Sequence, residues 1–390
     1  MIHIFVNALA ASAGGGVTYV RNILPHIAVH GDVRATVLVE PTLRRDLGIW
    51  NNVKFLETQS RAAASGRFWF EQRRLPEFLR HSAADVLISA GNFALWNSPV
   101  PQILLSRNAL YTSTDFIDDL RRRGDYPLWL DTELKGAFAK ASIRKADVTI
   151  APSEAFAEEL RRWTGKNVLA IHHGFDAGTF LGGEGALPPD IQQKLADAQG
   201  CIRLLFVSHY NYYRNFETLI RALALLRDRF APRKVRLILT CQLRSDANPG
   251  SYHADAAARL VRELDLSQNI IELGSVPYRL LHHVYRAADM YVTAAYAESF
   301  AHPLVEAMSV GLPIVASDLA VHREICKTAA VYFDRFSPED LAHQIEQKAL
   351  SGRIEENSEA SKRRSRDFSW RTHVEQIVAV AQRLLPRTNW

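Results

Sequence analysis

Two glutamates beside a very short predicted helix form the segment of the sequence best suited to chemistry. Glu298 lies in a loop after a predicted strand, and Glu306 lies one turn into a helix predicted at 303–310. Pro303 suits the first turn of that helix and Gly311 the position just past its end. Backbone N–H groups at the helix N-terminus suit a phosphate, and the two carboxylates would accept hydrogen bonds from ligand hydroxyls. A pair of solvated glutamates beside a tight turn is the alternative.

The elements that must position this segment follow a repeated β-α pattern. Strands are predicted at 2–6, 33–39, 85–89, 102–106, 147–151 and 168–171, then at 203–207, 235–240, 270–273, 290–293 and 314–316. Helices are predicted from Val17, Ser153 and Asn215, at 253–264, 278–287 and 303–310, and near 370–385. Two such series imply two parallel sheets, each with helices on both faces. Because ligands bind beyond the carboxyl ends of parallel strands, the α/β chain should hold its site in the cleft between two domains.

A stretch rich in glycine and proline separates the two series, and the 390 residues are enough for two domains. We expect a first domain at 1–176, a linker at 177–200 and a second domain at 201–368. The last helix, within 369–390, has no strand to follow and should cross back onto the first domain.

Composition excludes several classes of protein. The formal net charge of +5 is modest for this length and does not argue for nucleic acid as a partner. The three cysteines, Cys201, Cys241 and Cys326, fit neither a disulfide framework nor a metal site and suit a reducing cytoplasm. Since the N-terminus lacks the basic region of a signal peptide and the apolar stretches are interrupted, we expect no export signal and no spanning segment.

The sequence also lacks several motifs of nucleotide and catalytic sites. It contains no G-x-G-x-x-G, no G-x-x-x-x-G-K-[ST], no H-E-x-x-H, no G-x-S-x-G and no D-x-D. A dinucleotide site and an α/β-hydrolase are therefore disfavoured. A mechanism without a metal ion is favoured, because the D-x-D clamp for a nucleotide diphosphate is missing.

The run from Ala287 to Asp318 resembles the E-x7-E signature of glycosyltransferase family 4, the retaining nucleotide-sugar transferases of GT-B fold. Three other segments are similar to family segments in the expected order: Ala151-Pro-Ser-Glu-Ala, Ile171-His-His-Gly-Phe-Asp and Val276-Pro-Tyr-Arg-Leu-Leu-His-His-Val-Tyr-Arg-Ala-Ala-Asp. The resemblance covers most of 145–335 and is looser before that. It implies two Rossmann-like domains facing across a cleft, with the donor bound mainly by the second domain and the acceptor mainly by the first.

The resemblance assigns roles to individual residues. Glu298 would lie near the donor sugar, and Glu306 would hold the ribose hydroxyls. The diphosphate would be cradled by Phe300, Ala301, His302, Pro303 and Leu304. Further donor-binding positions are Gly15, Gly16, His209, Asn215 and Val276.

Arg214 and Asn215 stand where the family usually has Lys-Gly or Lys-Asn. Departure of a nucleoside diphosphate builds negative charge on the β-phosphate, which a fixed guanidinium would stabilise by ~3 kcal/mol or more. Arg214 and Glu298 are therefore the catalytic candidates, and Glu298 positions rather than attacks. A surface arginine with no such role is the alternative.

The chain departs from the family pattern in two places. Ser208 and His209 replace a common arginine, so His209 is either a second phosphate cation or a core histidine. The usual first-domain histidine is also missing, so Arg107 and Asn108 are candidates for acceptor or sugar contact. The glycine run 14–16 matches the family's glycine-rich loop, and a plain tight turn explains it equally well.

The implied function is a metal-independent, retaining hexosyltransferase. It would move a sugar from a UDP- or GDP-sugar to a hydroxyl of a glycan or lipid-linked acceptor, in bacterial surface polysaccharide or lipopolysaccharide biosynthesis. The nucleotide sugar is a co-substrate, and no cofactor is expected. The alternatives are a GT-B sugar-phosphate synthase or phosphorylase, and a catalytically silent nucleotide-sugar binder.

Basic and aromatic residues interleave at 67–80, and a second basic run at 121–123 follows in the same predicted domain. On a helix such a face could contact an anionic membrane. We therefore expect a cytoplasmic protein with peripheral contact at the inner face of the membrane. Trp69 and Phe70 could equally belong to the core.

Overall fold

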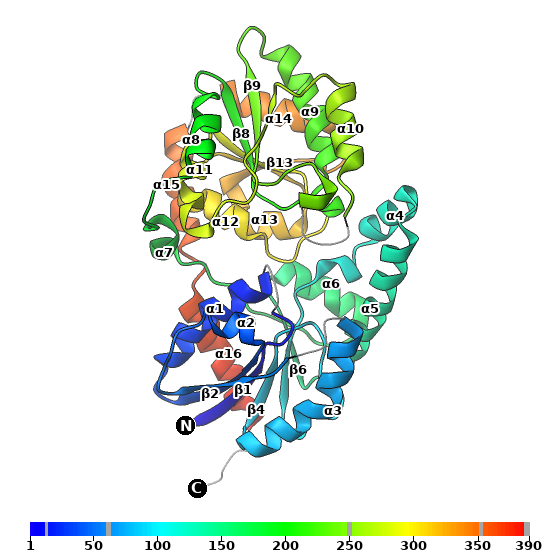
Figure 1. Cartoon of the computed structure of the whole chain (residues 1–390), viewed down its shortest axis with the longest axis vertical. Coiled ribbons are helices and arrows are strands. Elements are labelled where there is room, and N and C mark those ends of the chain that lie inside the picture. Colours follow the sequence, from blue (N-terminus) through cyan, green and yellow to red (C-terminus); the bar gives the residue numbers. More distant parts are fainter. Residues whose placement is uncertain (12–14, 60–63, 248–251, 351–353, 386–390) are drawn as a thin grey trace. The chain divides into compact units, whose positions relative to one another are not determined.

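The computed structural model describes residues 1–11, 15–59, 64–247, 252–350 and 354–385. They form two compact α/β units (Figure 1). The first unit comprises Met1–Thr112, Trp129–Gly174 and Ser369–Trp390, and the second comprises Ser113–Leu128 and Phe175–Phe368.

The first unit is built on a parallel sheet of seven strands in the order β3-β2-β1-β4-β5-β6-β7. Its strands are β1 (Ile2–Asn7), β2 (Val33–Val39), β3 (Val53–Glu57), β4 (Val86–Ser89), β5 (Gln102–Leu105), β6 (Val148–Ala151) and β7 (Leu169–Ala170). Its helices are α1 (Gly15–Ala28), α2 (Pro41–Arg44), α3 (Ala64–Ser82), η1 (Ala109–Tyr111), α5 (Tyr126–Lys145), α6 (Glu154–Thr164) and α16 (Trp370–Leu384).

Helices cover both faces of this sheet, which explains why its strands are nearly continuous apolar runs. On one face, Ile4 of β1 shares a buried cluster with Ile377 of α16 and with residues of α1. On the other face, Phe5 packs in a cluster with Leu75 of α3. The C-terminal helix therefore packs on the first unit, as predicted, and Figure 1 shows α16 (red) beside α1 (blue).

The second unit holds a parallel sheet of six strands in the order β10-β9-β8-β11-β12-β13. Its strands are β8 (Ile202–Phe206), β9 (Val235–Leu239), β10 (Ile270–Glu272), β11 (Met290–Thr293), β12 (Ile314–Ser317) and β13 (Ala330–Phe333). Its helices are α4 (Thr114–Arg123), α7 (Ala177–Leu181), α8 (Pro189–Ala196), η2 (Tyr212–Arg214), α9 (Phe216–Arg229), η3 (Ser245–Ala247), α10 (Asp255–Glu263), η4 (Tyr278–Leu280), α11 (Leu281–Arg286), α12 (His302–Ser309), α13 (Ala320–Cys326), η5 (Lys327–Ala329), α14 (Pro338–Leu350) and α15 (Ile354–Ser365).

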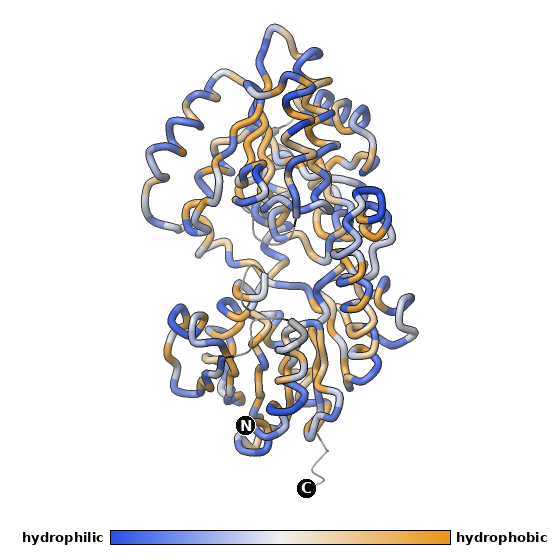
Figure 2. The backbone as a smooth tube through the Cα atoms, turned by 45° about the vertical axis from the view of Figure 1, so that its right-hand side comes forward, coloured by the Kyte–Doolittle hydropathy of each residue, from blue (hydrophilic) through white to orange (hydrophobic). Residues whose placement is uncertain are grey.

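The predicted fold class, two parallel-sheet Rossmann-like domains, is confirmed. Local signals also hold: the Ser153 side chain caps α6, and Gly165 ends it in the left-handed conformation at φ 70°. Strands β3 and β13 were not predicted. Figure 2 shows the hydrophobic residues gathered on the central strands of each unit and the hydrophilic ones on loops and outer helix faces.

Helix α4 packs with the second unit, although the sequence places it inside the predicted range 1–176. Phe116 is fully buried and lies edge-on against the Tyr213 ring, with the centroids 6.1 Å apart. Asp115 forms an ion pair of 2.8 Å with Arg335. The prediction that the basic run 121–123 shares a domain with the run 67–80 is therefore wrong, since the first lies on α4 and the second on α3.

Candidate functional site

Each sheet has a topological switch point, where the strand order reverses and ligands bind beyond the carboxyl ends of the strands. In the second unit this point lies between β8 and β11, which pair in parallel. The loop after β8 carries Arg214 and the loop after β11 carries Glu298. The topology therefore explains how two residues far apart in the sequence reach one place.

Arg214 and Glu298 form an ion pair in which a guanidinium N–H donates to the carboxylate. Only 18% of the Arg214 side chain and 12% of the Glu298 side chain are exposed. Burial alone would raise the pKa of the Glu298 carboxyl, but the Arg214 charge and hydrogen bond outweigh it and hold that pKa below its usual value. Glu298 is therefore ionised at neutral pH, and Arg214 is not a surface arginine.

Glu306 is buried in a different electrostatic environment. Its carboxylate accepts a hydrogen bond of 2.7 Å from the Tyr285 hydroxyl of α11. Burial raises the pKa of Glu306 to about 7, against the effect of that hydrogen bond. Because the group then binds a proton part of the time at neutral pH, it can both donate to and accept from a ligand hydroxyl. Neither glutamate is solvated, so the alternative of a solvated pair is wrong.

The start of α12 has the geometry expected from the sequence. Ala301 precedes the helix in the left-handed conformation at φ 68°, Pro303 lies in the first turn, and no described side chain caps this end. The Leu304 N–H donates to the Ala301 carbonyl at 3.1 Å. Phe300 is buried, edge-on to Phe368 at 5.4 Å, and its ring lies 4.8 Å from that of His302. This packing fixes the loop that presents the positive end of the helix dipole.

The other donor-side candidates of the second unit lie in the loops after β8 and β10. Asn215 adopts φ 54° at the start of α9, and its amide donates to the Arg335 carbonyl at 2.7 Å. His209 is exposed, so the alternative of a core histidine is wrong. Val276 is half-buried in the loop after β10.

In the first unit, the glycines after β1 lie at the start of α1. A side chain at Gly16 would place its Cβ 3.1 Å from the Ala11 Cα, so the close approach of the two backbones favours glycine there. Gly15 is exposed, and its carbonyl accepts a hydrogen bond of 3.3 Å from Arg107. Gly14 lies outside the described residues.

Arg107 and Asn108 follow β5 and hold backbone groups in place. Arg107 also donates to the Ala90 carbonyl at 2.5 Å and lies over the Tyr19 ring at 4.7 Å. Burial lowers the pKa of its guanidinium. The Asn108 side chain accepts a hydrogen bond of 3.1 Å from the Leu110 N–H and caps η1.

A network that the sequence did not reveal joins α4 to the loops that carry Arg214 and Glu298. The Tyr296 hydroxyl donates to Asp119 of α4 at 2.7 Å, while the Tyr296 N–H donates to the Tyr213 carbonyl at 2.9 Å. Arg123 pairs with Asp119 at 2.9 Å and with Glu217 at 2.8 Å. The loops that carry Glu298 and Arg214 are thus tied together and to α4. The only sequence signal was the spacing of four residues between Asp119 and Arg123, which is typical of an ion pair within one helix. That spacing does not indicate that Tyr296 and Glu217 bind the same two side chains.

Both halves of the chain match models of known protein families. Residues 13–178 match the family model described as Glycosyltransferase Family 4, and residues 189–366 match the model described as Glycosyl transferases group 1.

Two curated relatives illustrate the sequence similarity. The chain is 29% identical over 153 residues to the D-inositol 3-phosphate glycosyltransferase of Corynebacterium aurimucosum, a match that covers 39% of this chain and 35% of the relative. It is 23% identical over 282 residues to the serotype-specific mannosyltransferase WbdA of Escherichia coli, covering 67% of this chain and 30% of the relative. The matches therefore span about a third of the length of these relatives.

Solved structures match nearly the whole chain at low identity. Sucrose-phosphate synthase from Thermosynechococcus elongatus gives a TM-score of 0.75 at 18% identity, covering 98% of this chain and 99% of that chain. Anabaena HepE in complex with UDP-glucose gives a TM-score of 0.73 at 19% identity, covering 98% and 100%. At such identities the likeness establishes the fold alone.

Proposed function

This chain belongs to glycosyltransferase family 4 and has the GT-B fold, and from that premise we propose that it is a retaining hexosyltransferase. It would transfer a sugar from a UDP- or GDP-sugar to a hydroxyl of a glycan or lipid-linked acceptor. The observation that carries the proposal is the buried Arg214–Glu298 pair at the switch point of the second sheet, in the unit that also holds the uncapped start of α12.

The proposed reaction proceeds on one face of the donor sugar. The bond between the anomeric carbon and the β-phosphate oxygen breaks, and its electron pair stays on that oxygen. The oxygen then accepts the proton of the acceptor hydroxyl, while the hydroxyl oxygen bonds to the anomeric carbon. Arg214 and the positive end of α12 would stabilise the charge on the leaving diphosphate. Glu298 holds the guanidinium in place, and the sequence supports a mechanism without metal ion because it lacks a D-x-D motif.

The protonation state of Glu306 suits the ribose. A carboxyl group whose pKa is near 7 can donate one hydrogen bond and accept another from neighbouring hydroxyls. Tyr285 fixes its orientation from α11. We therefore assign Glu306 to the ribose hydroxyls and the segment 300–304, with His209, Asn215 and Val276, to the rest of the donor.

The acceptor side of the proposal falls on the first unit. Arg107 and Asn108 fix the backbone after β5, and Arg107 also holds the Gly15 carbonyl at the start of α1. We expect Arg107 and Asn108 to affect acceptor binding mainly by fixing the backbone after β5 and at the start of α1. Gly16 allows the backbone beside α1 to approach closely, and Gly15 and Gly16 remain the donor-binding candidates of this unit.

A lipid-linked acceptor would bring the protein to a membrane surface. None of the described helices has the length and apolar character needed to cross a bilayer. Helix α3 presents exposed basic residues and Trp69, which is 53% exposed and therefore not a core residue, whereas Phe70 packs against the core. We propose peripheral contact of this face with anionic lipid in the cytoplasm. Sedimentation with vesicles tests it, and equal binding to neutral and anionic vesicles would refute it.

The biological setting that we propose is bacterial surface polysaccharide or lipopolysaccharide synthesis. It is supported by the similarity to a relative whose name describes a serotype-specific mannosyltransferase. Its test is the ability of the purified chain to extend such a glycan from a nucleotide sugar.

The first test of the donor site is thermal stability with UDP, GDP, ADP and their common sugars, in the presence of EDTA. A ligand at ~100 times its dissociation constant should add roughly 2.7 kcal/mol to the stability of the native state. We expect a shift with one base, and no shift in Glu306→Ala. If a shift occurs without turnover of any acceptor, the silent binder is favoured. Turnover with a sugar phosphate as acceptor favours the synthase, and no shift with any nucleotide refutes the donor site.

A further inference from the structure

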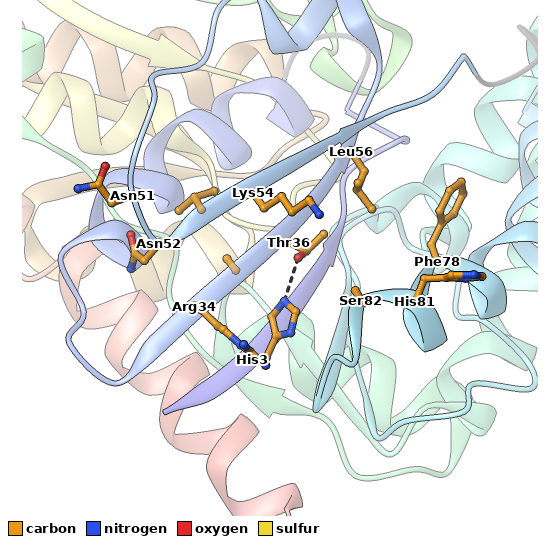
Figure 3. Close-up of a pocket in the computed structure, with 12 residues that line it drawn as sticks. His3, Arg34, Thr36, Asn51, Asn52, Lys54, Leu56, Phe78, His81 and Ser82 are labelled. Carbon is orange, nitrogen blue, oxygen red and sulfur yellow. Dashed lines mark hydrogen bonds between the residues drawn. The ribbon is translucent and has the colours of Figure 1, made fainter.

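A hollow of about 460 Å³ opens in the first unit at the amino ends of three strands (Figure 3). We name it the amino-edge pocket. It is lined by His3, Arg34, Ala35, Thr36, Asn51, Asn52, Val53, Lys54, Leu56, Phe78, His81 and Ser82. His3, Arg34 and Lys54 are each the second residue of their strand, β1, β2 and β3. The pocket therefore lies at the opposite edge of the sheet from Gly15, Gly16 and Arg107, which follow the carboxyl ends of β1 and β5.

Strand register explains why the polar side chains of the pocket gather on one face. His3 pairs with Arg34, and Thr36 pairs with Lys54, across neighbouring strands. Side chains two residues apart share a face of the sheet, so His3 lies on the same face as Phe5, which packs in the cluster with α3. The pocket thus lies on the α3 side of the sheet, and Figure 3 shows Phe78, His81 and Ser82 coming from α3, across the hollow from Thr36 and Lys54.

The charge of the lining has one sign. Arg34 and Lys54 are exposed, and neither forms an ion pair within the described parts of the chain. The described lining contains no carboxylate. Asp85 is the nearby acid, and its side chain accepts a hydrogen bond of 2.7 Å from the backbone N–H of His3. Two cations held on adjacent strands with no acid between them are suited to a dianion such as a phosphate.

A hydrogen bond joins two buried side chains of the lining. The His3 Nδ1–H donates to the Ala83 carbonyl at 3.2 Å, so its Nε2 accepts from the Thr36 hydroxyl at 2.8 Å. Burial lowers the pKa of His3, which favours this neutral form. Both polar hydrogens are therefore used inside the protein, and Arg34 and Lys54 remain the donors for an anion.

The remaining wall is apolar. Leu56 and Phe78 are partly buried and pack against the cluster between the sheet and α3. A pocket of this volume accommodates a small organic molecule and not only an inorganic ion. An aromatic ring opposite a cation pair suits a phosphate ester whose carbon skeleton lies on the ring.

We propose that the amino-edge pocket binds a phosphate monoester, with the phosphate between Arg34 and Lys54 and the organic part against Phe78. This site is separate from the nucleotide-sugar site and does not depend on the proposed function. The phosphate could belong to a soluble metabolite or to a lipid headgroup, and the experiment distinguishes these two sources.

The test uses the full chain and two probes, glycerol phosphate and phosphatidylcholine vesicles with or without phosphatidic acid. The pocket variant is Arg34→Glu with Lys54→Glu. The matched control is Lys145→Glu with Lys166→Glu, which reverses two exposed charges of the first unit outside both the pocket and α3. Binding of glycerol phosphate is measured by calorimetry against glycerol at equal ionic strength. Circular dichroism checks the fold, and Arg34→Gln with Lys54→Gln replaces the pocket variant if it does not fold.

We expect the pocket variant to lose affinity for one probe by about tenfold or more, because two charge-assisted hydrogen bonds disappear. The control with Lys145→Glu and Lys166→Glu and the variant Arg214→Ala should bind that probe like the wild type. Loss confined to glycerol phosphate identifies a soluble ester, and loss confined to phosphatidic acid vesicles identifies a headgroup. The proposal is overturned if the pocket variant binds both probes like the wild type. It is also overturned if Arg214→Ala or the matched control abolishes the binding instead.

Discussion

The switch points of the two sheets each hold a partly buried arginine, but the two guanidinium groups have different partners. In the first unit, Arg107 donates to the carbonyl oxygens of Gly15 and Ala90 and lies over the Tyr19 ring. In the second unit, Arg214 pairs with the Glu298 carboxylate. The same strand order therefore positions two different arrangements. In the first unit backbone carbonyl groups hold the Arg107 cation, and in the second unit the Glu298 carboxylate neutralises Arg214.

The difference has a measurable electrostatic consequence. Burial lowers the pKa of the Arg107 guanidinium. Burial would also lower the pKa of the Arg214 guanidinium, but the negative charge of Glu298 has the larger effect and raises it. A charge pair of this kind keeps its cation in a fixed place and leaves little net charge when no ligand is bound. A ligand with a diphosphate can then use a preorganised guanidinium, which is the main requirement for stabilising a leaving group.

Breaking the pair in the second unit should have the largest effect. We expect Arg214→Ala to lower kcat by about 100-fold to 1,000-fold, because the stabilisation of the leaving phosphate is lost. Steady-state kinetics with the nucleotide sugar identified by the stability panel measures this.

The control for Arg214→Ala is Arg203→Ala, which breaks the Arg203–Asp289 pair of 2.8 Å at the amino end of β8 in the same unit. It should cost stability and leave kcat within a few-fold of the wild type. Equal losses of kcat in the two variants would show that Arg214 has only a structural role.

Glu306 sharpens the comparison, because its carboxyl is buried without a cationic partner among the described contacts. Its folded-state pKa of about 7 exceeds the usual value of 4.5, so the folded state keeps a proton that the unfolded state has lost. Stability should therefore fall as the pH rises from about 4.5 to about 7 and level off above that. The full effect is about 3 kcal/mol.

We expect Glu306→Gln to remove this pH dependence, since the amide does not titrate and can still accept from Tyr285. Relative to the wild type, the variant should gain about 2 to 3 kcal/mol of unfolding free energy between about pH 5 and pH 8. Urea unfolding at the two pH values measures the difference. Parallel pH profiles for the variant and the wild type would contradict the assignment.

Weakening the first switch point should have a smaller effect. We expect Arg107→Gln to lower stability by about 1 kcal/mol, because the Ala90 carbonyl, in a partly buried hydrogen bond, and the exposed Gly15 carbonyl lose a charged donor. The KM for the acceptor should rise more than kcat falls. Arg44→Gln is the matched control, since Arg44 donates to the Leu47 carbonyl at 3.0 Å and lies over the Phe55 ring at 4.2 Å. If both variants change the acceptor KM alike, the acceptor-side assignment of Arg107 fails.

The smallest effect should come from the link between α4 and the loops that carry Arg214 and Glu298. Tyr296→Phe removes one hydrogen bond to Asp119, worth about 1 kcal/mol. We expect kcat to fall a few-fold while the KM for the nucleotide sugar stays unchanged, because Tyr296 acts on the position of Glu298. Tyr332→Phe, which removes a hydrogen bond of 2.6 Å to the Lys327 carbonyl, is the control. A change in KM alone would show that Tyr296 is not a positioning residue.

The sequence predicted most of the fold because local signals agree with the long-range structure. The run at 33–39 is a strand with the predicted bounds, and Ser153 and Gly165 bound their helix as expected. Strand β3 was missed because it covers only five positions, Val53–Glu57, of which Val53 alone is buried.

The candidate site was less accessible to sequence reasoning. The spacing of Glu298 and Glu306 indicated both residues, but not that Arg214 holds one and Tyr285 the other. Asp119 carries no local sign that it accepts from a tyrosine 177 positions later. Such contacts depend on how the elements pack, which the pattern of a single chain does not contain.

The grouping of α4 with the second unit limits how this chain can be divided. The chain passes between the units four times, at 112–113, 128–129, 174–175 and 368–369. A fragment cut at the linker would leave Phe116 without Tyr213, and would separate Asp119 from Tyr296. Exchange of donor halves between relatives would therefore succeed only if residues 113–128 moved together with the second sheet, so a single recombination point is not enough for this chain.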